Sequence, residues 1–276
     1  MRFGVLTFVT DEGITPVELG EGVEQREFSS LFLAEHSHIP VDAQTPYPLG
    51  GGPIPRKYHR TLDPFVALTA AAVATEKLVV GTGIALIPQR DPILTAKEVV
   101  SLDLVSRGRF RFGVGVGWLR EEIANHGVDP GVRGRVVDER LAAMIEIWTQ
   151  EKAEFHGEFV DFDPIYSWPK PATKPYPPLY LGGGPATFRR IVGLNAGWLA
   201  MSPSADSLSK QLEKLRALAD HEVPVINIHL GEPTAKELEG YGSLGLEQLL
   251  VELPTEPRDE TLRRLDELQT EFAKLA

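Results

Sequence analysis

Short apolar runs recur along the chain, and most are followed by a segment in which apolar residues return every three or four positions. The runs have the composition of buried strands, and the segments between them have the period of amphipathic helices. The runs begin near Arg2, Ser30, Leu78, Arg109, Pro178, Gly197, Pro224 and Glu247. Alternating strands and helices indicate a parallel sheet, and about eight such pairs predict an α/β fold, a single (β/α)8 TIM barrel spanning residues 1–276 without a domain boundary.

Local signals support this reading of the helices. The clearest helical segments are 15–28, 62–76, 133–150 and 204–220. Thr15, Asp63 and Asp91 each precede a proline, and this pairing favours a helix that begins at the proline. Residues 153–177 interrupt the alternation, and we expect them to form a small hairpin followed by a proline-rich connector.

Composition narrows the class of protein. The chain contains no cysteine, which excludes disulfides, thiolate metal sites and cysteine nucleophiles. A net charge of −11 argues against nucleic-acid binding, which needs a basic face. The first residues lack the apolar core and cleavage site of a signal peptide, and no apolar run approaches the roughly 18 residues of a membrane span. We therefore expect a cytoplasmic protein that acts on a small molecule, with neither nucleic acid nor membrane as partner.

In such a barrel the active site lies where the strands end. His36 and His38 follow the second predicted strand, at the start of a proline- and glycine-rich loop that continues to Arg60. A His-x-His pair at a strand end is compatible with a divalent metal, and so with a metal-dependent hydrolase. Two other interpretations are a single histidine that acts as acid or base, which we favour, and histidines that are merely solvated in the loop. No other strand end supplies a complete set of ligands, so we expect no metal and take His36 as the catalytic candidate.

Glycines mark the other strand ends. Gly81 and Gly83 interrupt one strand and 113–117 carries three alternate glycines in the next, so we expect both strands to form walls of a ligand site. Gly182, Gly183 and Gly184 lie between a strand and a helix predicted to begin at Pro185. Their backbone N–H groups suit a phosphate. The alternative is a tight turn that needs a positive φ.

The segments AEHSHIP (34–40), GTGIALIPQRDPILTAKEVVSLDLVSRGR (81–109), GVGVGWLREE (113–122) and PPLYLGGGP (177–185) together resemble the luciferase-like monooxygenase superfamily, in particular its deazaflavin-dependent oxidoreductases. The resemblance runs from Phe3 to about Leu268. It implies a (β/α)8 barrel, in agreement with the count of strands and helices, and hydride transfer between coenzyme F420 and an organic substrate. FMN is the alternative cofactor, as in an FMN-dependent monooxygenase. It also implies a homodimer as one option, although no apolar stripe in the sequence marks an interface.

The resemblance also implies roles for individual residues. Gly83 and Ile84 match the place where members often have a non-prolyl cis peptide behind the central ring of the cofactor. Residues 182–184 match the backbone that holds the cofactor phosphate, and Val116 and Gly117 match residues along its polar tail. His36 matches a histidine near the reactive carbon in several members.

Two departures from the family pattern affect the mechanism. Members with a catalytic glutamate place it just after the fourth strand, where Glu121 and Glu122 follow Trp118 and neither is securely aligned. The segment after the seventh strand is shorter than in true luciferases, which weakens the case for oxygen activation. We therefore favour hydride transfer, with a barrel that binds the cofactor without turnover as a further hypothesis. Three basic residues of the long loop are candidates to meet the anionic tail of the deazaflavin, and they are Arg56, Lys57 and Arg60.

Overall fold

A computed structural model describes residues 1–274 and shows eight parallel strands closed into a barrel. The barrel strands are β1 (Arg2–Thr7), β2 (Ser30–Leu33), β3 (Val79–Thr82), β5 (Phe110–Gly115), β8 (Leu179–Gly182), β9 (Gly197–Met201), β10 (Val225–His229) and β11 (Gln248–Glu252). Each strand pairs in parallel with the next of this series, and β11 pairs with β1 to close the ring. The short strand β4 (Ala85–Leu86) pairs with the end of β5. The predicted (β/α)8 barrel is confirmed.

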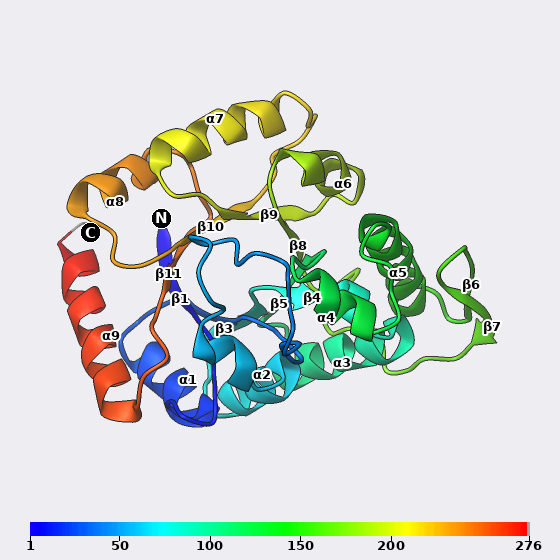
Figure 1. Cartoon of the computed structure of the whole chain (residues 1–276), viewed down its shortest axis with the longest axis horizontal. Helices are drawn as coiled ribbons and strands as arrows, with labels where there is room; N and C mark the ends of the chain where they lie inside the picture. Colours follow the sequence, from blue (N-terminus) through cyan, green and yellow to red (C-terminus); the bar gives the residue numbers. More distant parts are fainter. Residues whose placement is uncertain (275–276) are drawn as a thin grey trace.

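The helices surround the strands (Figure 1). They are α1 (Pro16–Gln25), α2 (Pro64–Val73), α3 (Pro92–Val105), α4 (Arg120–Asn125), α5 (Arg133–Thr149), α6 (Phe188–Gly193), α7 (Ala205–Arg216), α8 (Ala235–Gly242) and α9 (Arg258–Ala273), with the 3-10 turns η1 (Arg56–Arg60), η2 (Ile87–Gln89) and η3 (Pro185–Thr187). The predicted hairpin is also present, as β6 (Ala153–His156) and β7 (Asp161–Ile165) outside the ring. Among residues 1–274, no helix combines the length and apolar character that crossing a bilayer requires.

The predicted helix starts are confirmed at atomic detail. The Thr15 side chain accepts a hydrogen bond from the Glu18 N–H, and Asp91 accepts one from the Leu94 N–H. Asp63 caps α2 in the same way. Each cap satisfies backbone donors that the first turn of a helix leaves free.

The strands bury side chains on both faces because the barrel has an inside and an outer layer of helices. Inside the barrel, Leu6, Phe32, Tyr180, Leu199, Ile226, Ile228 and Leu250 form one cluster, with Ile84 packed against it. Residues one position away, such as Val5 and Leu249, belong to the larger core between strands and helices. This alternation explains why the strands appear as continuous apolar runs in the sequence. Side chains therefore fill the barrel interior, so a ligand must bind at the ends of the strands rather than inside the barrel.

Candidate functional site

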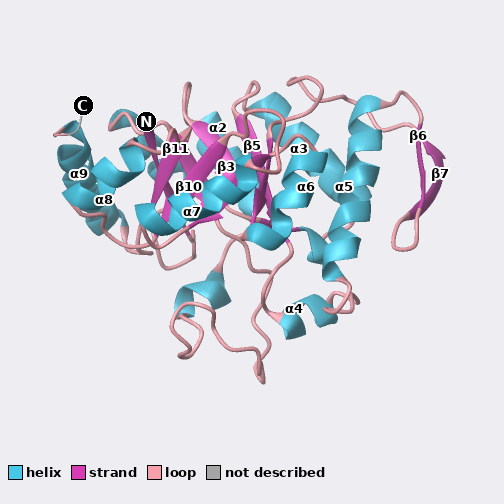
Figure 2. Cartoon of the chain, turned by 90° about the horizontal axis from the view of Figure 1, so that it is seen from above, coloured by secondary structure: helices cyan, strands magenta, loops and turns pink. Residues whose placement is uncertain are grey.

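The candidate site lies at the end of the barrel where the strands finish. In Figure 2 the loops and α4 project from the end of the barrel opposite the N-terminus. The loop of residues 34–55 follows β2 there, and α4 follows β5. Glu121 in the first turn of α4 accepts hydrogen bonds from the backbone N–H groups of Gln44 and Thr45, both at 3.1 Å. The helix thus fixes the long loop over the strand ends.

His36 and Glu122 form a buried pair at this end. The His36 Nδ1 atom lies 2.7 Å from Oε2 of Glu122, although the two residues are 86 positions apart. Glu122 is 0% exposed and His36 is 7% exposed. Burial raises the pKa of Glu122, but the hydrogen bond and charge of His36 outweigh it and leave that pKa below its ordinary value. The carboxylate therefore holds the Nδ1–H of His36, and proton exchange with a ligand falls to Nε2.

Aromatic rings enclose His36. The Tyr58 ring centroid lies 5.0 Å from that of His36, and the Trp118 centroid lies 5.8 Å away. Tyr47 adds a third ring, with its hydroxyl 3.2 Å from that of Tyr58, and Phe8 packs against Tyr58 from the end of β1. Burial raises the pKa of Tyr58 well above its ordinary value, so its phenol stays protonated. Such a surrounding excludes water and strengthens the interaction of His36 with Glu122.

The two histidines of the His-x-His pair have separate partners. His36 pairs with Glu122, whereas His38 Nδ1 lies 2.9 Å from the Ser37 hydroxyl and its Nε2 accepts from the Asn125 amide, also at 2.9 Å. In residues 1–274 no three His, Asp or Glu side chains gather as a metal shell would require. The arrangement therefore gives the metal-dependent alternative no supporting geometry.

The Gly83–Ile84 peptide is cis, at the position where a cis bulge was expected. The Ile84 side chain lies against two glycines of neighbouring strands. A Cβ on Gly115 would approach Ile84 Cδ1 to 1.9 Å, and one on Gly182 would approach Ile84 Cγ2 to 3.2 Å. The bulge thus brings the Ile84 side chain onto strands that lack side chains at these points.

The strand glycines lie against protein atoms on the side where a Cβ would point. A Cβ on Gly81 would meet the Phe32 ring at 2.4 Å, and one on Gly113 would meet the Thr82 carbonyl oxygen at 2.0 Å. Protein atoms therefore fill the space beside them. Glycine is required here because the barrel packs closely, which the sequence pattern does not distinguish from approach by a ligand.

The Gly182–Gly184 segment forms a turn between β8 and η3. Gly183 has a φ of +119°, and a Cβ there would lie 2.6 Å from the Thr187 hydroxyl oxygen. Its carbonyl accepts a 2.7 Å hydrogen bond from the Trp198 indole. Pro185 begins a 3-10 turn rather than an α-helix, and α6 follows at Phe188. The tight-turn explanation therefore holds for Gly183, whereas a Cβ on Gly184 would meet nothing nearer than 3.9 Å.

Val116 and Gly117 directly follow β5, at the same end of the barrel as His36. Both are partly exposed, and Gly117 has a φ of +72°. A Cβ on Gly117 would lie 3.2 Å from Ile123 Cδ1, so the chain turns closely against α4 there. The turn places the next residue, Trp118, beside His36.

The basic residues of the long loop are bound to acidic residues of the protein. The pairs are Arg56 with Glu12 (2.9 Å), Arg60 with Asp11 (2.7 Å) and Lys57 with Glu252 (2.6 Å). Each positive charge is already matched by a carboxylate. Contact of these three residues with an anionic cofactor tail therefore stays a prediction of the sequence, and the ion pairs give it no support.

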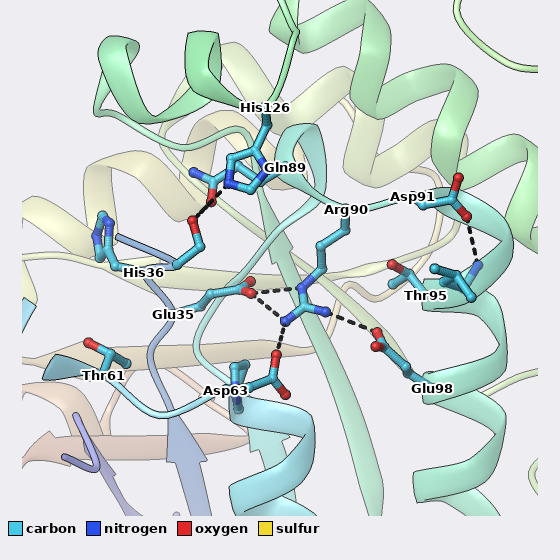
Figure 3. A pocket seen from close by; sticks show the side chains of 13 residues that line it. Glu35, His36, Thr61, Asp63, Gln89, Arg90, Asp91, Thr95, Glu98 and His126 are labelled. Carbon is cyan, nitrogen blue, oxygen red and sulfur yellow. Dashed lines mark hydrogen bonds and ion pairs between the residues drawn. The ribbon is translucent and has the colours of Figure 1, made fainter. Parts of the chain in front are cut away.

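A cavity of about 390 Å³ opens beside the His36–Glu122 pair (Figure 3). His36, Gln89 and His126 line one part of it, and Arg90 lies among acidic residues in another. Arg90 donates to Glu35, Asp63 and Glu98 at 2.7, 2.6 and 2.9 Å. Burial lowers the pKa of Arg90, but the charge of Glu35 and the other carboxylates raises it above the ordinary value. This cation is fully occupied in tying α2 and α3 to the end of β2.

Glu122 is the site residue that sequence reasoning did not assign. The sequence places two acids together after Trp118, and nothing in their spacing tells which one turns inward. In the structure Glu121 faces the long loop and Glu122 faces His36. The only signal in the sequence was the position of two acids directly after a barrel strand, and it does not separate Glu121 from Glu122.

Comparison with known proteins places this geometry in a family. The sequence profile of the luciferase-like monooxygenases matches residues 1–228. The chain is 35% identical to the uncharacterized protein Rv0953c of Mycobacterium tuberculosis over 280 residues, 99% of each chain. It is 31% identical to an FMNH(2)-dependent dimethylsulfone monooxygenase of Pseudomonas putida over 154 residues, 54% of this chain and 42% of that one. An F420-dependent secondary alcohol dehydrogenase in complex with an F420-acetone adduct shares the fold, with a TM-score of 0.72, 17% identity and coverage of 97% and 98%.

Proposed function

This chain belongs to the luciferase-like monooxygenase family, and from that premise we propose that it transfers a hydride between coenzyme F420 and a small organic substrate. The observation that carries the proposal is the buried His36–Glu122 pair under aromatic rings at the strand ends. When bound, the deazaflavin supplies the ring carbon that accepts or gives the hydride. The chain itself orients the reactants, excludes water and exchanges one proton at His36 Nε2.

The residues at the strand ends suit such a cofactor. The open space beside Gly184 leaves room for a phosphate at the 182–184 turn. The Gly83–Ile84 bulge would back the central ring, and Val116 and Gly117 would follow the polar tail. These assignments concern residues that follow or end strands of the barrel, where a ligand of such a fold binds.

The connection after β10 favours hydride transfer over oxygen activation. The strand β10 ends at His229 and α8 begins at Ala235, so only a short loop lies between them. Oxygen chemistry on a flavin needs a closed pocket that protects a reactive intermediate, and a short loop provides little cover. The dimethylsulfone monooxygenase among the relatives nevertheless makes an FMN-dependent monooxygenase the second candidate.

Turnover with the purified protein tests the proposal. We would follow the absorbance of oxidised F420 with a panel of alcohols, and that of reduced F420 with the matching carbonyl compounds. His36→Asn should abolish turnover while cofactor binding remains, and Glu213→Gln, on the exposed side of α7, should change neither. Tight F420 binding without turnover of any compound would support the non-catalytic alternative. Turnover only with reduced FMN and oxygen would favour the monooxygenase.

We infer further that two copies of the chain associate through α2 and α3. Val66 and Val73 on α2 are 72% and 71% exposed, and Leu94 on the neighbouring α3 is 66% exposed. The two valines are seven positions apart, so they lie on one face of α2, a helix without any charged residue. Because each copy carries a net charge of −11, an uncharged face is where two copies can approach at least cost.

A further inference from the structure

The Ser37 hydroxyl lies between the buried pair and two further histidines, the half-buried His38 and the exposed His126. Its Oγ atom is 3.1 Å from Glu122 Oε1 and 3.3 Å from Gln89 Oε1, two atoms that only accept hydrogen bonds. It is also 2.9 Å from His38 Nδ1 and 2.8 Å from His126 Nε2. A hydroxyl has a single proton to donate, so these neighbours compete for it.

The hydrogen bond from Asn125 settles the direction at His38. The Asn125 amide nitrogen donates to His38 Nε2, which must therefore carry a lone pair. A neutral His38 then carries its proton on Nδ1 and donates it to Ser37 Oγ. The direction of the hydrogen bond between Ser37 and His126 is not fixed in this way. His126 Nε2 donates to Ser37 Oγ when it is protonated and accepts from it when it is not.

We propose that Ser37 couples the charge of His126 to the His36–Glu122 pair. A protonated His126 donates to Ser37 Oγ and turns the Ser37 proton toward Glu122. A neutral His126 with an unprotonated Nε2 accepts a hydrogen bond from the Ser37 hydroxyl. Glu122 Oε1 then keeps the backbone N–H groups of Ser37 and His38, at 2.8 and 3.5 Å, and loses the hydroxyl. No covalent bond other than N–H changes, and the proton of His126 comes from water. Ser37 is thus a positioning residue for Glu122.

The surroundings of His126 suit this role. His126 is exposed at the surface and also lines the 390 Å³ cavity, so it exchanges protons with water, whereas Glu122 does not (Figure 3). Burial of part of its ring lowers the pKa of His126 below 6.5, and the charges of His38 and Arg140 add to this while Glu122 and Glu35 oppose it. Despite burial, the pKa of Glu122 is also lowered, by its hydrogen bond to His36, so the charge of Glu122 persists as the pH falls below the ordinary pKa of a glutamate.

The coupling has a consequence for His36. A carboxylate that loses one donor attracts its remaining donors more strongly. When His126 loses its proton, Glu122 pulls harder on the Nδ1–H of His36. The geometry of the catalytic candidate thus responds to a group that does not touch it. For turnover this inference rests on the proposed function, but the coupling itself does not need a cofactor.

NMR of cofactor-free protein labelled with ¹⁵N-histidine tests the coupling. We expect the Nδ1–H resonance of His36 to move with the same midpoint as the titration of His126. Ser37→Ala should remove this movement, and so should His126→Gln. Ser37→Thr, which keeps the hydroxyl, should retain it. The His36 resonance itself is identified by its loss in His36→Gln.

Two outcomes would overturn the inference. One is a His36 resonance in the unaltered protein that ignores the titration of His126. The other is a Ser37→Ala protein in which the response persists, which would show direct coupling of charges through space. A folded Ser37→Ala protein is recognised by unchanged resonances of His156 and His221, whose partners are Asp161 and Asp220. These results can be interpreted even if the redox proposal is wrong, because the experiment uses no cofactor.

Discussion

At the scale of single residues, the site depends on Glu122. Its Oε2 atom holds His36, and its Oε1 atom accepts from the Ser37 backbone, so both oxygens have partners inside the protein. A carboxylate buried in this way fixes the ring orientation and the tautomer of the histidine beside it. Glu122 is therefore as important to the account as His36, although it does not have to touch a ligand.

Replacing Glu122 should slow the reaction more than it weakens binding. Glu122→Gln keeps the shape of the side chain but removes the charge that holds the His36 Nδ1–H. We expect the turnover number to fall by roughly 100-fold, the lower range for a lost general acid–base contribution, with little change in cofactor affinity. Steady-state kinetics measures this, with Glu213→Gln as the control. Equal turnover of the two variants would remove Glu122 from the mechanism.

The contribution of Glu122 to the stability of the fold should depend on pH, and Glu122→Gln measures it. Because the pKa of Glu122 in the folded protein lies below the ordinary 4.5, its ionised form stabilises the fold above that pH. This contribution is lost as the pH falls through the folded-state pKa. The difference in unfolding free energy between the unaltered protein and Glu122→Gln should thus shrink on acidification. Urea unfolding at neutral pH and near pH 4 measures it, and a difference that grows toward low pH would contradict the assignment.

At the scale of elements, the Ile84 side chain links three strands at the edge of the site. It follows the break between β3 and β4 and lies over glycines of β5 and β8. The hydrogen bond from Gly83 N–H to the Leu33 carbonyl, at 2.7 Å, ties the same point to β2. The glycines of β5 and β8 thus leave the space that the Ile84 side chain occupies at the edge of the site.

A methyl group at Gly115 should disrupt this arrangement. Its Cβ would lie 1.9 Å from Ile84 Cδ1, so either the side chain or the strand must move. We expect Gly115→Ala to lower the unfolding free energy by about 1 to 3 kcal/mol, as overpacking does. Gly242→Ala on α8 is the control, because nothing lies within 4 Å of its Cβ. Urea unfolding of both variants decides, and equal stability would show that the Ile84 contact is not tight.

Elements were predictable from the sequence because their signals are local. Predicted strand starts such as Leu78 and Pro178 differ by one residue from the observed Val79 and Leu179. The His36–Glu122 pair was not predictable, because it depends on which side of α4 faces the barrel. The neighbours of the strand glycines were not predictable either, since they come from other strands, as Phe32 beside Gly81 does. That these strands form walls of a ligand site stays a prediction.

At the scale of the whole molecule, the apolar face of α2 and α3 predicts a dimer. Val66→Asp with Val73→Asp adds negative charge to a face that should meet a second, acidic copy. We expect light scattering to give the mass of a dimer for the unaltered protein and of a monomer for this variant. Leu218→Asp serves as the control, because Leu218 is 50% exposed elsewhere. A monomeric unaltered protein would contradict the interface.

The most direct test of the central claim is a fluorescence titration of the purified, cofactor-free protein with F420 and, in parallel, with FMN. We expect binding of F420 in the micromolar range or tighter, with much weaker binding of FMN. Tighter binding of FMN than of F420 would favour an FMN-dependent enzyme instead. Binding of neither would contradict the account, because the glycine turn and the enclosed His36 would then serve no redox cofactor.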